Sequence, residues 1–203
     1  MNRGELTALT LKGLSAWLVL SGLIWYLGAW LITALFPVTQ SVIMLLAPEL
    51  SSSLHVIESS PGQLNQFVEL SAWTLRPIYL NDNQFIAPQT ELKVKANLLH
   101  VMVPLVIQGS ILLVWPVQRL SQRLLLIALG VLTAILVIMA VLPAQLLGNL
   151  EISFQDVAIT GKNPRAVPGF LDWMVFCELG GRWLLAVASA WLCIQLQRWL
   201  LPN

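Results

Sequence analysis

Charged residues are scarce in this sequence. Only 10% of the 203 residues are Asp, Glu, Lys or Arg, whereas 57% are hydrophobic and the mean hydropathy is +0.77. Soluble domains carry about 25% charged residues, so the composition predicts an integral membrane protein. The formal net charge is only +1, which gives no electrostatic reason to expect a nucleic-acid partner.

Cysteine is almost absent, and the short motifs of common catalytic sites are missing. Cys177 and Cys193 lie 16 residues apart on one expected helix, about 24 Å at 1.5 Å per residue, so they cannot pair with each other. No CxxC pair or Cys/His cluster predicts a metal. The loop 158–170 lacks the order of a phosphate loop, and HExxH, GxSxG and paired carboxylates do not occur. We therefore expect no cofactor, no metal, no nucleotide and no enzyme activity.

Long apolar runs are what the chain has instead. A helix needs about 20 apolar residues to cross a bilayer, and four runs approach that length. The N-terminal run is about 22 residues long, more than the apolar core of a signal peptide, so we interpret it as a retained span. The predicted spans are 14–36, 98–115, 124–142 and 173–194, the first three ended by Pro37, Pro116 and Pro143.

The distribution of charge predicts how these spans are oriented. Short basic loops stay in the cytoplasm, and the basic residues flank one side of the expected spans, whereas acidic residues gather in segments 37–97 and 143–172. We therefore predict that both termini are cytoplasmic and that these two segments lie outside. The basic residues on the predicted cytoplasmic side are Arg3, Lys12, Arg119, Arg123 and Arg198, five of the 11 Lys and Arg residues in the chain.

The first outer segment is too long for a plain connector. It begins with an apolar stretch, TQSVIMLLAPEL, that predicts a short interfacial helix, and then alternates with period 2, as in Leu92-Lys93-Val94-Lys95. Turn residues at 60–62 and 81–83 divide it into three or four strands. A further strand pair is a candidate at 149–159.

The predicted fold class is a membrane all-α bundle of four transmembrane helices with a small extracytoplasmic antiparallel β segment. The expected organisation is 1–36 (cytoplasmic N-terminus and first span), 37–97 (β-rich insert), 98–142 (second span, basic turn, third span), 143–172 (outer loop with the candidate strand pair) and 173–203 (fourth span and cytoplasmic C-terminus).

The last span carries three charges in the stretch FLDWMVFCELGGRWLLAVASAWL. Each charge costs about 2.5–3.5 kcal/mol at the centre of a membrane helix. Glu178 and Arg182 are spaced i, i+4 and share a helix face, and Asp172 lies where a carboxylate caps a helix start. The favoured interpretation is a capped helix with an ion pair turned inward. A face that docks a partner is the alternative. Proton conduction is disfavoured, because the other spans contain no carboxylate.

The second span has a polar stripe. Asn97, His100, Pro104 and Gln108 are spaced by three and four residues, and polar groups within a bilayer must find partners in the protein. We interpret the stripe as a helix-packing surface, with a binding groove as the alternative.

An intramembrane cysteine enzyme is a competing hypothesis. Cys177 and His100 are expected at similar depth, and cysteine and histidine can activate each other. Two features oppose this. The adjacent Glu178 disfavours a thiolate. Arg182, the residue that could hold an anionic intermediate, lies about 140° from Cys177 on a helical wheel, so the two do not share a helix face.

The layout resembles a known family. One span precedes an outer β-rich segment ending in LKVKANLLHVMVPLVIQGSILLVWP, then come the basic turn VQRLSQRLL, a third span and a charged last span. This is similar to the small accessory membrane proteins encoded with bacterial exosortases, of the exosortase H-associated type. The resemblance implies a bacterial inner-membrane protein that helps an intramembrane cysteine transpeptidase process C-terminally anchored surface proteins. It does not equate Cys177, Arg182 or His100 with the catalytic residues of exosortases.

Three functional hypotheses follow. The first is a non-enzymatic accessory subunit of an envelope protein-processing or export machine, whose partners are membrane lipids and another integral membrane protein, an exosortase in particular. The second is the cysteine enzyme. The third is a small transporter or lipid-handling subunit that uses the stripe together with Glu178 and Arg182.

Overall fold

The computed structural model describes residues 3–58, 66–81, 84–160 and 166–201. The chain divides into two compact units. Unit 1 comprises Met1–Gly28, Met102–Ile138 and Gly180–Asn203, and unit 2 comprises Ala29–Val101 and Met139–Leu179. Two long helices contribute residues to both units.

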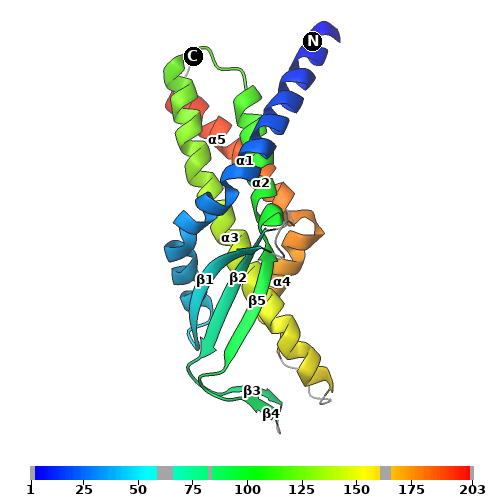
Figure 1. Cartoon of the computed structure of the whole chain (residues 1–203). Coiled ribbons are helices and arrows are strands. Elements are labelled where there is room, and N and C mark those ends of the chain that lie inside the picture. Colours follow the sequence, from blue (N-terminus) through cyan, green and yellow to red (C-terminus); the bar gives the residue numbers. More distant parts are fainter. Residues whose placement is uncertain (1–2, 59–65, 82–83, 161–165, 202–203) are drawn as a thin grey trace. The chain divides into compact units, whose positions relative to one another are not determined.

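Helices make up most of the chain, as its apolar composition predicts. They are α1 (Arg3–Leu46), α2 (Leu98–Val114), α3 (Leu120–Thr160), α4 (Gly169–Phe176) and α5 (Arg182–Leu200), and a π-helical segment, η1 (Cys177–Gly181), joins the last two (Figure 1). Within the part of the chain that the structure describes, three helical stretches are long and apolar enough to cross a membrane: Thr10–Leu46, Leu120–Ile159 and Gly169–Leu200. α2 is apolar but has only 17 residues.

Two prolines do not end their helices. Pro37 lies inside α1, and Pro143 lies inside α3. The expected interfacial helix after Pro37 is therefore wrong, because most of that stretch is the end of α1. The candidate strand pair at 149–159 is also wrong, because these residues continue α3 to Thr160.

A side chain bonds the backbone of α3 one turn before the second proline. Proline lacks the N–H that would bond the carbonyl four residues earlier, so Pro143 leaves the Met139 carbonyl without its helical donor. The indole Nε1 of Trp173 donates to the neighbouring Ala140 carbonyl at 2.8 Å. A side chain of α4 thus bonds the backbone of α3 at the proline.

The sheet of unit 2 confirms the predicted small antiparallel β segment. β1 (Leu50–Glu58), β2 (Gln66–Thr74) and β5 (Glu91–Asn97) lie side by side in the order β1-β2-β5 (Figure 1). A separate hairpin is formed by β3 (Ile78–Asn81) and β4 (Gln84–Ile86).

One face of the sheet is apolar and buried. Leu54, Leu70 and Val94 stand opposite one another on the three strands, and Leu70 is fully buried. Cross-strand neighbours of this kind are the main source of stability in a sheet. The period-2 alternation of the sequence therefore places its apolar residues where burial is greatest.

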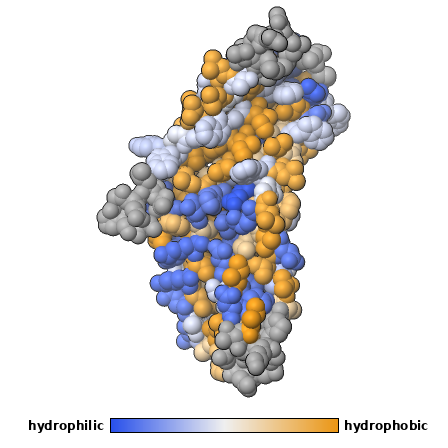
Figure 2. All heavy atoms as spheres, turned by 90° about the vertical axis from the view of Figure 1, so that its right-hand side faces the viewer, coloured by the Kyte–Doolittle hydropathy of each residue, from blue (hydrophilic) through white to orange (hydrophobic). Residues whose placement is uncertain are grey.

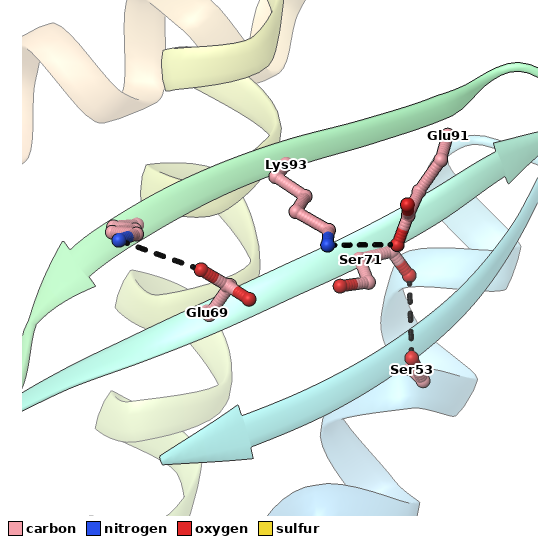
Figure 3. Close-up of polar contacts among 6 residues, drawn as sticks. Ser53, Glu69, Ser71, Glu91 and Lys93 are labelled. Atoms are coloured by element: carbon pink, nitrogen blue, oxygen red, sulfur yellow. Dashed lines mark hydrogen bonds and ion pairs between the residues drawn. The ribbon is translucent and has the colours of Figure 1, made fainter. Parts of the chain in front are cut away.

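The other face of the sheet is polar. Figure 3 shows Ser53, Glu69, Ser71, Glu91 and Lys93 on the three strands. Lys93 Nζ lies 3.2 Å from Glu91 Oε1, and Lys95 Nζ lies 3.5 Å from Glu69 Oε2. Alternate residues of β5 thus carry charge on one face and apolar side chains on the other.

The surface of unit 1 has the opposite character. One buried cluster is formed by Leu112, Leu126, Ala190, Cys193 and Ile194. Large apolar side chains point outward from all four of its helices, and Figure 2 shows exposed hydrophobic residues over much of the drawn face. The exposed ones include Leu18, Val19, Leu113, Leu124, Val131, Leu132, Leu136, Leu184 and Trp191.

Candidate partner-binding site

The last helical stretch that is long and apolar enough to cross a membrane is interrupted where its charges lie. α4 ends at Phe176, η1 follows, and α5 begins at Arg182. Gly180 has φ = +112° and ψ = −4°, in a region that side-chain-bearing residues rarely adopt. The expected continuous helix over 173–194 is therefore wrong, and Glu178 and Arg182 are separated by a backbone irregularity instead of a regular helical turn.

Glu178 is held by a residue that the sequence analysis missed. Its Oε1 accepts a hydrogen bond from Nε2 of Gln145 at 2.9 Å. Gln145 is only 8% exposed, and among the residues that the structure describes its Oε1 has no hydrogen-bond partner. The sequence signal was a lone amide in the apolar run VLPAQLLG after Pro143.

Glu178 is exposed on an otherwise apolar segment. Val175, Phe176 and Leu179 are exposed large hydrophobic side chains, and Leu179 is 84% exposed. An exposed carboxylate next to side chains suited to lipid is a costly arrangement unless a polar group covers it.

Arg182 begins α5 and is buried, with 8% of its surface exposed. Both Arg182 and Glu178 have interaction partners. The ion pair between them stays a prediction, and a double-mutant cycle given below tests it.

Asp172 lies in the first turn of α4, where a negative charge is favoured by the helix dipole. It is not the cap that the sequence predicts. The N-cap is Pro168, which makes no side-chain cap hydrogen bond. The helix starts earlier than expected because Gly169 and Phe170 already belong to it.

Three residues of the predicted polar stripe, Asn97, His100 and Gln108, have separate structural surroundings. Asn97 Oδ1 accepts hydrogen bonds from the backbone N–H of Leu99 at 2.9 Å and of His100 at 3.4 Å, so Asn97 is the N-cap of α2. His100 is exposed in the first turn. Gln108 is buried in unit 1, where its Nε2 donates to the Gly130 carbonyl and to Thr133 Oγ1 of α3.

Both cysteines are buried. Cys193 Sγ lies 3.2 Å from Thr133 Oγ1, next to Gln108 in the same polar cluster of unit 1. Cys177 in η1 is only 3% exposed, and such enclosure is typical of cysteines that pack. In the described ranges, no group of three or more His, Cys, Asp or Glu side chains could hold a metal ion.

No protein-family model, curated protein or solved structure matches this chain. The likeness to exosortase-associated proteins thus rests on the layout of the sequence.

Proposed function

We propose that this chain is a non-enzymatic accessory subunit of a bacterial inner-membrane machine that processes or exports envelope proteins. Its partner is another integral membrane protein, and the sequence resemblance favours an exosortase. One observation carries the proposal. Glu178 is fixed by Gln145 at 2.9 Å and exposed among apolar side chains, at a break in a helix long and apolar enough to cross a membrane.

A partner would remove the cost of this arrangement. A carboxylate within or close to lipid is stabilised by a cation or a hydrogen-bond donor from a neighbouring helix. Gln145 satisfies one oxygen of Glu178. A carboxylate can accept several hydrogen bonds at once, so an exposed Glu178 can contact a donor from a second membrane protein while it stays bonded to Gln145.

The polar sheet supports the same proposal from the water-exposed part. Its outer face carries Glu69, Glu91, Lys93 and Lys95 in mixed sign. Mixed charges steer and align a partner more than they strengthen its binding. We assign the outer sheet the role of a second contact surface for the same partner.

We further propose four spans, formed by α1, α2, α3 and α4–α5, with both termini in the cytoplasm and the sheet outside. α2 has 17 residues, about 25 Å of helix, which lies at the short end of the range for a span. Reporter fusions after Gln122 should read cytoplasmic, and fusions within 84–90 should read periplasmic. The reverse pattern would contradict this topology.

The test of function is capture of the tagged full chain from native membranes in mild detergent. We expect one membrane protein to co-purify at near-stoichiometric level. Glu178→Gln should reduce the ratio of partner to captured chain at least several-fold, because it removes the charge and leaves a similar shape. Asp172→Asn is the matched control, since it neutralises another exposed carboxylate of the same segment. Equal partner recovery with both variants, or a chain that purifies alone, would contradict the proposal.

A second measurement separates this proposal from the cysteine-enzyme hypothesis. Cys177→Ala should leave partner recovery and cellular function near normal at a normal protein level, because the proposal gives this buried thiol a packing role. Complete loss of function in a well-folded Cys177→Ala protein would favour the enzyme.

A further inference from the structure

Unit 1 contains a pocket that the proposed function does not use. It has a volume of about 580 Å³ and lies where the turn between α2 and α3 meets the end of α5. The residues that matter for its chemistry are Trp115, Val117, Gln122, Gln197, Arg198 and Leu201. The wall is therefore part apolar and part polar.

The pocket wall is built from ordered polar side chains. Gln122 is 2% exposed, and its Oε1 accepts from the backbone N–H groups of Gln118 and Arg119 at 3.3 Å each. This is the reach-back half of a capping box, which secures the start of α3. Gln122 Nε2 also donates to the Leu201 carbonyl at 3.4 Å. One side chain thus ties the turn to the end of α5.

Gln197 supplies an unused polar group. It is 4% exposed and lines the pocket. Within the described ranges no hydrogen bond of its side chain is found. Its side-chain amide, which faces the pocket, can therefore donate to an oxygen of a ligand bound there.

Arg198 supplies the charge. Its guanidinium carbon lies 5.1 Å from the ring centroid of Trp115. The backbone that carries this ring is held in place, because Arg123 donates to the carbonyls of Leu112, Leu113 and Trp115 at 2.9–3.1 Å. In the described part of the chain, no carboxylate lies within ion-pair distance of Arg198. Segments 102–138 and 180–203 contain arginine but no Asp or Glu.

The position of the pocket limits its ligand. Irregular backbone between two apolar helices is not tolerated in contact with lipid chains, so the turn after α2 belongs at a membrane surface. Tryptophan is enriched there, and basic pockets between membrane helices at that depth bind acidic headgroups. The apolar Val117 and Leu201 in the wall suit the adjoining glycerol and acyl carbons.

We propose that this pocket binds the phosphodiester headgroup of an anionic phospholipid. Arg198 contacts the phosphate, and the amide of Gln197 donates to a phosphate or headgroup oxygen. The proposal depends on a membrane location but not on the partner protein.

The test measures lipid retention by the purified full chain. Native mass spectrometry would count phosphatidylglycerol bound from mixed micelles, with phosphatidylcholine at equal mole fraction as competitor and inorganic phosphate added in a separate arm. We expect clear preference for phosphatidylglycerol. Arg198→Gln should weaken its binding roughly tenfold, as expected for loss of one charge-assisted contact. Arg119→Gln is the matched control, because it removes the same charge from an exposed side chain of the same turn.

Three outcomes would overturn the proposal. They are equal retention of the two lipids by the unaltered chain, equal loss of binding in Arg119→Gln and Arg198→Gln, and full competition by millimolar inorganic phosphate. The last would assign the pocket to free phosphate. If Arg198→Gln does not fold, Gln197→Leu keeps the charge and side-chain size, and should still lower phosphatidylglycerol retention several-fold. Unchanged retention in Gln197→Leu would also contradict the proposal.

Discussion

The helices of unit 1 and the sheet of unit 2 distribute polarity in opposite ways. In unit 1, the amide of Gln108 is 2% exposed and Leu136 is 59% exposed. In the sheet, Leu70 is fully buried and the side chain of Lys93 is 53% exposed. A surface with exposed leucine and buried glutamine suits lipid, and a surface with exposed lysine and buried leucine suits water. The helices of unit 1 therefore have a surface suited to lipid, and the sheet of unit 2 has one suited to water.

Within the single helix α3, leucine side chains differ in how far neighbouring residues cover them. Its first part, in unit 1, exposes Leu124, Val131 and Leu132, whereas its second part, in unit 2, buries Leu142 and Leu146. Both parts are leucine-rich, so composition does not distinguish them. The neighbours that cover the second part do.

The largest effect is expected from a charge placed in the apolar face of the sheet. Leu70→Asp puts a carboxylate between Leu54 and Val94 on the central strand. Burying an unpaired charge there should cost more than about 5 kcal/mol and unfold the sheet. The measurement is proteolysis of the purified chain, which should cut within 50–97 much faster than in the unaltered protein.

Glu69→Gln is the control for that change, because it alters the neighbouring residue on the polar face of the same strand. It should leave the proteolysis rate close to that of the unaltered protein. A resistant Leu70→Asp protein would mean that the apolar face of the sheet is not the buried one.

The next largest effect concerns the charges at the helix break. If Glu178 and Arg182 neutralise each other, removing one leaves an uncompensated charge at membrane depth, at a cost of about 3 kcal/mol or more. Glu178→Gln and Arg182→Gln should each lower abundance or complex assembly, and the double variant should recover much of it. Thermal unfolding of the four proteins gives the coupling free energy directly.

Simple addition of the two single effects would show that the pair is not an ion pair. Each charge would then meet a different group, which agrees with the proposed docking of a partner at Glu178.

The sequence predicted the parts of the fold whose signals are local. The antiparallel sheet follows from period-2 alternation, and the start of α2 follows from the abrupt change after Lys95 to a continuous apolar run. The N-cap role of Asn97 was also readable, because asparagine directly precedes that run. The sequence analysis missed it by assigning Asn97 to a membrane stripe.

The parts that failed depend on distant residues. Pro143 can remain within α3 while Trp173, 30 residues later, bonds the adjacent carbonyl. The segment 149–159 alternates like a strand, yet its buried residues Leu150, Phe154 and Ala158 fit a helical period. The expected continuous helix over 173–194 is broken at Gly180, whose φ is positive. Residues close in the sequence do not predict these three features.

A moderate effect is expected where α3 is covered. A Cβ added to Gly148 would lie 3.0 Å from Cβ and Cγ of Met174, and closer still to its sulfur. Gly148→Leu should separate α3 from α4 and cost about 1–3 kcal/mol. The measurement is the shift in thermal unfolding temperature.

The same substitution in unit 1 is the control for that prediction. A Cβ at Gly22 meets nothing within 4 Å, and leucine favours a helix over glycine. Gly22→Leu should therefore be neutral or stabilising in micelles. Similar destabilisation by both substitutions would mean that the helix surface at Gly22 is covered like that at Gly148. Adding Met174→Ala to Gly148→Leu should partly restore the unfolding temperature.

The smallest effect is expected on the polar face of the sheet. The Lys95–Glu69 pair is half exposed on the lysine side, and Glu69 is 16% exposed. Exposed ion pairs contribute about 0–1 kcal/mol, so Lys95→Met should lower the free energy of unfolding by less than about 1 kcal/mol. Lys93→Met, which breaks the more open pair with Glu91, should cost no more. Chemical denaturation of both variants measures this.

A loss above about 2 kcal/mol for Lys95→Met would mean that water does not reach the pair, as expected only for a strongly shielded charge. The polar face of the sheet would then resemble the interior of unit 1, and the two regions would no longer differ in how they expose polar side chains. A small loss of stability accompanied by a clear drop in partner recovery would instead mark the sheet as the contact surface, because its charges would then matter for binding and not for folding.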